Sequence, residues 1–237
     1  MSALVVAQNL ALPGRLAETS LNLDAGALVC LVGPNGSGKT SLLHALAGIG
    51  RPRGSVRIDG IDPRRLTPAR RQRLLAYLPA AKEVGWPLPA ADLIALGTPD
   101  PEPRDSIAGL LDALELGDMA DRRVDRMSTG ERSRALIARA LIARPKLLLL
   151  DEPIANLDPR WQLKLMAKLR ADARAQNQAI LLAVHDLEVA RAYADRLIVM
   201  DGGAIVADGD PEALLDGPHI PQVFGIEKRE GGWRPLD

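Results

Sequence analysis

A short segment near the N-terminal end combines glycines, a lysine and a threonine in the spacing of a phosphate-binding loop. GPNGSGKT, from Gly33 to Thr40, matches G-x-x-x-x-G-K-[ST] and lies between an apolar run and a segment with helical spacing. Gly33, Gly36 and Gly38 let the backbone curl so that successive N–H groups face phosphate oxygens. Lys39 can then reach the β- and γ-phosphates, and the Thr40 hydroxyl can ligate Mg²⁺. The plainer interpretation is a glycine-rich turn with a solvated lysine, but the strand–loop–helix context favours the phosphate site.

Two further apolar runs end in side chains that suit phosphate chemistry. KLLLLDEP ends in Asp151, which can hold Mg²⁺ through water, and Glu152, which can polarise an attacking water as a general base. AILLAVHD ends in His185, whose imidazole can reach a γ-phosphate. An Asp-Glu pair is also a common helix cap, and we interpret His44 and His219 as ordinary surface or core residues. Because ligands collect where parallel strands end, the placement at one sheet edge favours the site.

The segment DRMSTGERSR, residues 125–134, contains a turn that leads directly into helical periodicity. Ser128 and Glu131 fit the S-x-x-E capping box. A helix N-terminus beside Gly130 also leaves backbone N–H groups pointing outward, where an anion can dock. From these residues alone, a capped helix and an anion site both remain open.

The elements that must position these residues alternate between strands and helices. Apolar runs predict strands at 4–10, 19–24, 27–33, 54–60, 146–153 and 179–186, and a hairpin at 196–209 that turns at Gly202-Gly203. Helical spacing predicts helices at 39–48, 63–75, 90–96, 105–116, 131–143, 159–175 and 187–194, then a short helix after Pro211 and an irregular tail. The pattern is α/β, with a helical lobe at about residues 80–140 inserted between two α/β halves.

Composition and charge limit the class of protein. The 237 residues are 47% apolar, and 30 basic residues balance 30 acidic ones, so the chain is globular and nucleic-acid binding is not expected. The basic run RRLTPARRQR fits a solvated helix face. Cys30 is the only cysteine, which excludes an internal disulfide and indicates a core thiol in a reducing compartment. No apolar run reaches about 18 residues and no signal peptide is recognised, so we expect a protein that is neither exported nor membrane-spanning.

In this order, the four motifs resemble those of the ATP-binding-cassette ATPases, over about residues 4–216. The resemblance makes Gly33 to Thr40 the Walker A loop, Leu147 to Asp151 the Walker B strand, and Met127 to Glu131 the signature motif. It makes Glu152 the catalytic base and His185 the switch histidine. It implies ATP and Mg²⁺ as cofactors, with Thr40 and Asp151 at the metal. The cofactor-binding residues that it implies are Gly33, Pro34, Asn35, Gly36, Ser37, Gly38, Lys39, Thr40, Ser41, Ser128, Gly130 and Asp158.

The same resemblance implies a fold and a partner. The fold is α/β: a P-loop NTPase core (1–79 and 141–216) with an antiparallel β subdomain, an inserted α-helical subdomain (about 80–140) and a C-terminal tail (217–237). In this family the signature motif of one subunit closes over the γ-phosphate held by the Walker A loop of another. A second copy of the chain is therefore expected, with Ser128 and the Gly130 N–H meeting its ATP. Asp158, in the D-loop at 156–158, is expected to act at this interface and as the N-cap of the next helix.

Three features depart from the family pattern. Ala80 stands where the family usually carries a glutamine that senses Mg²⁺ and the attacking water and abuts the membrane partner; Lys82 or Glu83 could substitute for it. Thr129 replaces the first glycine of the signature motif and adds a β-branched side chain beside the phosphate position. No aromatic residue precedes position 77, so we expect apolar contacts near Leu12 to Leu16 to hold the adenine.

RRQRLLAYLP, GWPLPAADLIALG and the tail IPQVFGIEKREGGWRPL resemble importer ATPases that serve vitamin B12, iron-siderophore and haem uptake, and the missing aromatic fits the B12 branch somewhat better. Such a subunit works with an integral membrane permease, whose coupling helix would enter a groove near Trp86 and Leu88, and indirectly with a substrate-binding protein. It lies peripherally on the cytoplasmic face of the bacterial inner membrane. A plain proline-rich surface loop is the alternative for the groove. The alternatives for the function are a non-transport ATPase acting on an iron–sulfur scaffold or DNA, and a low-turnover nucleotide-gated subunit.

Overall fold

Three apolar strands form the centre of the main sheet. The computed structural model describes residues 3–81, 87–98, 104–229 and 232–236. The strands β3 (Leu28–Val32), β6 (Leu147–Asp151) and β7 (Ala179–Ala183) are buried at every position, as expected for parallel strands covered on both faces. The sheet has the order β5-β6-β7-β3-β8-β9, in which only β9 is antiparallel to its neighbour. Its other strands are β5 (Leu75–Leu78), β8 (Arg196–Asp201) and β9 (Ala204–Gly209).

Alternate residues of each central strand enter two different cores. Leu28, Cys30 and Val32 pack in the core beneath α5 (Thr129–Leu141), α6 (Pro159–Gln176) and α7 (Leu187–Tyr193). Burial raises the pKa of the Cys30 thiol to about 12, with the charge of Asp195 adding to the effect, so this thiol is an inert core side chain.

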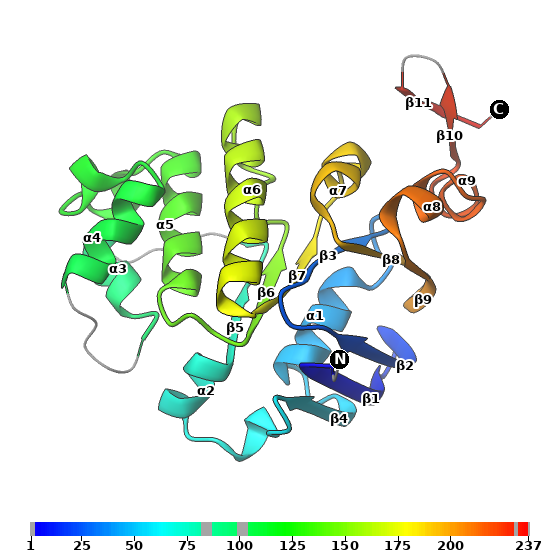
Figure 1. Cartoon of the computed structure of the whole chain (residues 1–237), viewed down its shortest axis with the longest axis horizontal. Helices are drawn as coiled ribbons and strands as arrows, with labels where there is room; N and C mark the ends of the chain where they lie inside the picture. Colours follow the sequence, from blue (N-terminus) through cyan, green and yellow to red (C-terminus); the bar gives the residue numbers. More distant parts are fainter. Residues whose placement is uncertain (1–2, 82–86, 99–103, 230–231, 237) are drawn as a thin grey trace.

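The other residues of β3, Val29 and Leu31, pack against α1 and a small antiparallel sheet. Figure 1 shows α1 between the main sheet and this small sheet. The small sheet has the order β2-β1-β4. Its elements and their helix are α1 (Lys39–Ala47), β1 (Val5–Leu12), β2 (Leu16–Leu23) and β4 (Arg53–Ile58).

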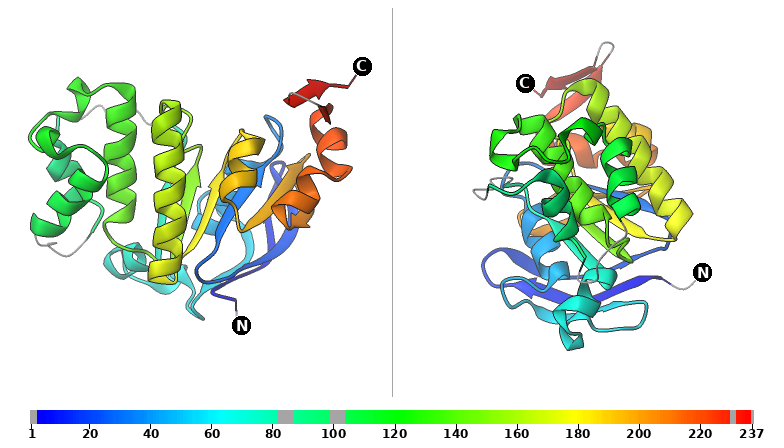
Figure 2. Two further views of the ribbon diagram at one scale, coloured as in Figure 1. Left: turned by 45° about the horizontal axis from the view of Figure 1, so that its top comes forward. Right: turned by 90° about the vertical axis from the view of Figure 1, so that its left-hand side faces the viewer.

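The helical part of the chain lies to one side of the main sheet (Figures 1 and 2). It consists of α3 (Ala90–Ala95), α4 (Arg104–Ala113) and α5, with short 3₁₀ turns at Gly117–Met119 and Val124–Arg126. These elements come between β5 and β6 in the chain, which places an inserted helical subdomain in an α/β core. The expected fold class is confirmed. The exact domain limits stay a prediction.

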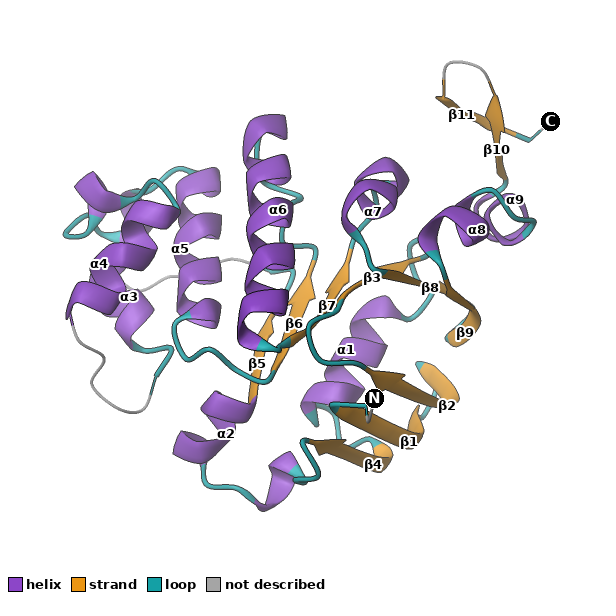
Figure 3. Ribbon diagram, viewed as in Figure 1, coloured by secondary structure: helices purple, strands orange, loops and turns teal. Residues whose placement is uncertain are grey.

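The structure corrects two sequence predictions. The helix expected at 63–75 is a 3₁₀ turn (Pro63–Arg65) followed by α2 (Pro68–Leu74), and the strand β5 begins at the next residue, where only pairing with β6 identifies it. The tail expected to be irregular contains the helix α9 (His219–Phe224) and a hairpin of β10 (Ile226–Arg229) and β11 (Gly232–Pro235), after α8 (Pro211–Leu215). Figure 3 shows this hairpin projecting beyond the sheet.

The tail hairpin is attached to the core by its tryptophan. The Trp233 indole N–H donates to Glu188 Oε1 at 3.0 Å, in the first turn of α7.

The predicted residues Lys82, Glu83 and Trp86 lie outside the described residues. Within the described ranges, no helix combines the length and the apolar character needed to cross a bilayer.

Candidate nucleotide-binding site

The loop between β3 and α1 can close only with glycines at its contact points. A Cβ on Gly33 would lie 2.3 Å from the Met200 carbonyl oxygen and 2.5 Å from Ser37 Oγ. Gly38 has φ of 100°, and its Cβ would lie 3.0 Å from Gly203 Cα. The tight loop therefore follows from backbone sterics, and it places the N-terminus of α1 at the end of a buried strand, the usual geometry for binding phosphate.

Lys39 supplies the positive charge of this loop. Its ammonium donates to the Gly33 carbonyl at 2.7 Å and to the Pro34 carbonyl at 3.0 Å, and the side chain is nearly buried. Burial lowers the pKa of Lys39, while the carboxylates of Glu152 and Asp151 oppose that shift. A group with several negative oxygens, such as a triphosphate, would supply the counter-charge that the loop carbonyls provide only in part.

A pocket of about 740 Å³ opens beside the loop. It is lined by the loop and the start of α1, from Asn35 to Ser41, and by Glu152. The β1–β2 turn, from Gly14 to Ala17, and Gly202 and Gly203 complete the lining. The predicted adenine contact near Leu12 to Leu16 thus overlaps this lining only at Gly14 to Leu16, and Arg15 adds a cation there.

Thr40 and Asp151 form the contact that joins the loop to β6. The Thr40 hydroxyl donates to Asp151 Oδ2 at 2.8 Å, while Oδ1 is buried and has no hydrogen bond within the described part of the chain. Burial raises the pKa of Asp151; the Thr40 hydrogen bond opposes this shift, and the Glu152 charge adds to it.

This pair fits a magnesium ion, because a hydroxyl and an orphaned carboxylate oxygen are ligands of the kind that Mg²⁺ takes beside nucleotide phosphates. Within the described ranges, no cluster of three or more His, Cys, Asp or Glu side chains could hold a metal. The ion would therefore depend on phosphate oxygens and water for its remaining ligands.

Tyr77 is a neighbour of Asp151 that sequence reasoning missed. It pairs with Leu149 across β5 and β6, so its side chain lies on the same face as Asp151. Its hydroxyl is buried and has no hydrogen-bond partner among the described residues. Burial raises the pKa of Tyr77, and the nearby Asp151 carboxylate adds to this shift. The His44 ring packs edge-on against the Tyr77 ring with centroids 5.3 Å apart. The sequence signal was weak, since the predicted helix ends at Leu75 and no strand is predicted where β5 lies.

Glu152 and His185 meet at the carboxyl edge of the sheet. Glu152 follows β6 with φ of 49°, a left-handed conformation that non-glycine residues adopt mainly at constrained sites. Its Oε1 lies 2.6 Å from Nε2 of His185, and both side chains are partly exposed to solvent. The structure thus brings together the two residues predicted from separate strand ends, beside the phosphate loop.

The remaining predicted residues lie outside this pocket. Ser128 caps α5: its Oγ accepts from the Glu131 N–H at 3.2 Å, and Glu131 Oε2 accepts from the Ser128 N–H at 2.8 Å, so the predicted capping box is present. Asp158 caps α6, accepting from the Trp161 N–H at 3.0 Å. Ser128, Gly130 and Asp158 do not line the pocket that holds Lys39, so one copy of the chain does not bring all the predicted residues together.

Ala80 and Thr129, the two departures from the family pattern, are both exposed. Thr129 is the first residue of α5 and follows the cap residue Ser128 directly. The α5 N-terminus therefore carries a β-branched side chain at its solvent-facing tip.

The family model for the ABC transporter family matches residues 16–155 of this chain. The hemin import ATP-binding protein HmuV of Nocardia farcinica is 38% identical over 217 residues, which cover 88% of this chain and 75% of that protein. The protein of the same name from Bordetella pertussis is 37% identical over 227 residues, covering 90% of this chain and 87% of the relative.

Solved structures agree in fold. A nucleotide-free ATP-binding cassette from an ABC transporter superposes with a TM-score of 0.79 at 22% identity, covering 94% of this chain and 99% of the other. A dimeric cassette in a post-hydrolysis state with ADP and phosphate gives 0.76 at 24% identity, covering 87% and 98%. With the phosphate loop, Asp151 and Glu152 placed as described and with these relatives, the chain belongs to the ABC transporter family, as one of its ATPase subunits.

Proposed function

We propose that this protein is the ATP-hydrolysing subunit of an importer for haem or a related iron-bearing or tetrapyrrole compound. The observation that carries the proposal is the arrangement at the sheet edge, where Lys39, Thr40 and Glu152 line one pocket. Asp151 is bound to Thr40, and His185 contacts Glu152. The names of the relatives supply the cargo class, and vitamin B12 and iron-siderophores remain the alternatives within it.

The chain's own residues bind and orient ATP. The loop N–H groups and Lys39 hold the phosphates. Thr40 and Asp151 would hold Mg²⁺, which when bound would neutralise phosphate charge and polarise the γ-phosphoryl group. Glu152 takes a proton from the attacking water, so that the water oxygen bonds to the γ-phosphorus as the bond to ADP breaks. His185 holds the Glu152 carboxylate in place through their contact.

A second copy of the chain completes the site in this proposal. The single pocket leaves the γ-phosphate open to water, whereas the α5 N-terminus, with Ser128 and Gly130, presents outward N–H groups elsewhere on the molecule. Two copies arranged head to tail would cover two nucleotides, each held by the loop of one copy and α5 of the other. Water exclusion by this closure would protect the reaction geometry.

A permease is the second partner in this proposal. A groove of about 300 Å³ lies between β5 and the helical subdomain and includes Leu78, Leu96 and Leu136; Leu96 is 48% exposed. An apolar groove with an exposed leucine suits a short amphipathic helix from a membrane protein on the cytoplasmic side. Leu88, predicted to line such a groove, does not line this one; its carbonyl instead accepts from the Val124 N–H at 2.9 Å.

Two measurements test the function. The isolated chain should hydrolyse ATP, and Glu152→Gln should lower that rate by about 10²- to 10⁴-fold while ATP still binds. Co-expression with a candidate permease should give a complex in mild detergent whose ATP hydrolysis depends on the haem-loaded binding protein. An undetectable rate in the unmodified chain and its complex would favour the nucleotide-gated alternative, and a chain that stays away from every permease would favour a non-transport role.

A further inference from the structure

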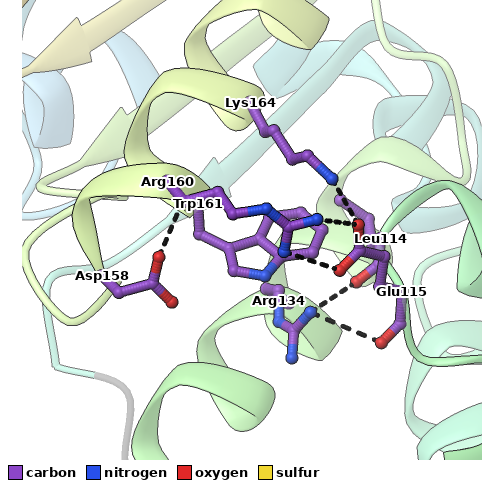
Figure 4. Close-up of polar contacts among 7 residues, drawn as sticks. All are labelled: Leu114, Glu115, Arg134, Asp158, Arg160, Trp161 and Lys164. Carbon is purple, nitrogen blue, oxygen red and sulfur yellow. Dashed lines mark hydrogen bonds and ion pairs between the residues drawn. The ribbon is translucent and has the colours of Figure 1, made fainter.

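An arginine, a tryptophan and an acidic residue join the signature helix to the helix that follows the D-loop (Figure 4). The Arg134 guanidinium, on α5, lies over the Trp161 ring of α6, with Cζ 4.3 Å from the ring centroid. The same guanidinium donates to the Leu114 carbonyl at 2.9 Å and to the Glu115 carbonyl at 3.4 Å. Arg134 therefore contacts the end of α4 and the first turn of α6 at once.

The Glu115 carboxylate also connects the turn after α4 with α6. Arg160 donates to its two oxygens at 3.2 and 3.3 Å, and the Lys164 ammonium also binds Oε1. The Lys164 Nζ atom also lies 5.3 Å from the centroid of the Trp161 ring. Figure 4 shows these side chains, from α5, α6 and the turn that follows α4, gathered around the indole.

The charged side chains around Arg134 belong to the signature motif, to the D-loop and to the turn after α4. Burial lowers the pKa of Arg134, and the carboxylates of Glu115, Glu131 and Asp158 oppose this effect in that order, while Arg160 adds to it. Glu131 belongs to the capping box at the signature motif, and Asp158 belongs to the D-loop. The guanidinium thus interacts electrostatically with both segments that the proposed dimer would present to a second nucleotide.

The connection to these segments is short. Arg134 is six positions after Ser128, or about 9 Å along an α-helix at about 1.5 Å per residue. The Trp161 backbone N–H donates to Asp158, and Trp161 is only 7% exposed. A Cβ on Gly130 would lie 3.5 Å from the Asn156 carbonyl oxygen, so the signature motif and the D-loop lie close together in one copy of the chain.

We propose that Arg134 and Trp161 are positioning residues, which hold the N-terminus of α5 at a fixed place relative to Asp158 so that both reach the nucleotide of the second copy together. By stacking on Trp161, the Arg134 guanidinium fixes the orientation of α5 relative to α6, which packs on the main sheet. This inference rests on the proposed function, because it requires the ATP-bound dimer. Neither Arg134 nor Trp161 lines the pocket beside the phosphate loop.

The test separates nucleotide binding from dimerisation. In a Glu152→Gln background, the protein concentration needed for ATP-dependent dimerisation is measured by analytical ultracentrifugation, and nucleotide affinity by titrating a fluorescent ATP analogue at a protein concentration too low for dimers. Arg134→Met should raise the dimerisation concentration about tenfold, the loss expected for a desolvated cation–π contact with its hydrogen bonds, and leave nucleotide affinity unchanged.

Milder variants and a matched control distinguish loss of this contact from misfolding of the chain. Trp161→Phe keeps a ring face and should restore most of the dimerisation that Trp161→Leu loses, and Arg134→Lys should lie between Arg134→Met and the parent. Arg70→Met removes an exposed arginine from α2 and should change nothing. Equal dimerisation in Arg134→Met and its parent, or parallel loss of nucleotide binding, overturns the inference. A Glu152→Gln parent that stays monomeric with ATP contradicts the proposed function itself, and the inference with it.

Discussion

Replacing Asp151 with Asn should make the nucleotide-free protein more stable, although Asp151 is expected to be essential for hydrolysis. Asp151 is 1% exposed, and one of its carboxylate oxygens has no hydrogen bond among the described residues. A buried acceptor left without a hydrogen bond costs about 1–3 kcal/mol, and more when the group is charged. Asn has nearly the same shape and can keep the bond from Thr40, so we expect a gain of about 1–2 kcal/mol. For a domain of this size, each kcal/mol raises Tm by about 2–4 °C.

The assay is thermal unfolding followed by circular dichroism, in EDTA and without nucleotide. Because the pKa of Asp151 is raised in the folded state, protonation stabilises the wild type. That stability is complete below the unfolded pKa of about 4 and is lost as pH rises through the folded pKa. The advantage of Asp151→Asn should therefore be largest at pH 7 and shrink towards pH 4. With ATP and Mg²⁺ added, the wild type should gain more stability than the variant.

Asp195→Asn is the matched control with the opposite sign. Burial alone raises the pKa of Asp195, but the Leu28 N–H at 3.0 Å and the guanidiniums of Arg170 and Arg174, each at 2.9 Å, outweigh it and lower the pKa. The stability from this lowered pKa is present above the unfolded pKa and is lost as pH falls through the folded one. Asp195→Asn should therefore lower Tm at pH 7. A lower Tm for Asp151→Asn at pH 7, or shifts of the same sign for both variants, would refute the electrostatic account.

Three further variants test single contacts. Lys39→Ala should weaken binding of a fluorescent ATP analogue at least about tenfold, because it removes a nearly buried cation from the loop, and unchanged affinity would contradict that role. Thr40→Val keeps the side-chain shape but removes the one hydrogen bond that the Asp151 carboxylate makes within the described ranges. It should therefore lower the unfolding free energy by about 1–3 kcal/mol in denaturant titrations without nucleotide. No loss would mean that the pair is not formed. Ser128→Ala should lower the unfolding free energy by about 1 kcal/mol, because it removes the cap of α5. The nucleotide affinity of the monomer should not change; a reduced affinity would place Ser128 in its own chain's pocket.

The phosphate loop and the sheet-edge residues were predictable because their signals are local. The conformation of the loop around Gly33 is determined by steric contacts, mostly within a few residues. The buried strands could be predicted because each is a continuous apolar run in the sequence. Asp151, Glu152 and His185 followed from the rule that parallel strands end at one edge. The capping box of Ser128 is also local, and the structure contains it.

The features that sequence reasoning missed depend on contacts between distant segments. β5 follows α2 without a turn residue, so only pairing of Leu75 with Leu147 makes it a strand, and the position of Tyr77 beside Asp151 depends on that register. The stacking of Arg134 on Trp161 joins two helices, and neither residue stands out within its own helix. Such contacts require the tertiary arrangement, which no local pattern encodes.

Formation of the ATP sandwich is the central claim, and a cross-linking measurement tests it most directly. Asn35→Cys and Thr129→Cys are introduced on separate copies in the Glu152→Gln background; both positions are exposed, and the native Cys30 is fully buried. With ATP and Mg²⁺, a short thiol cross-linker should join the two copies through these cysteines, and it should fail with EDTA or without nucleotide. Cross-linking that is absent with ATP and Mg²⁺, or equal in all three conditions, would contradict the claim that Ser128 and Gly130 of one copy complete the nucleotide site of another.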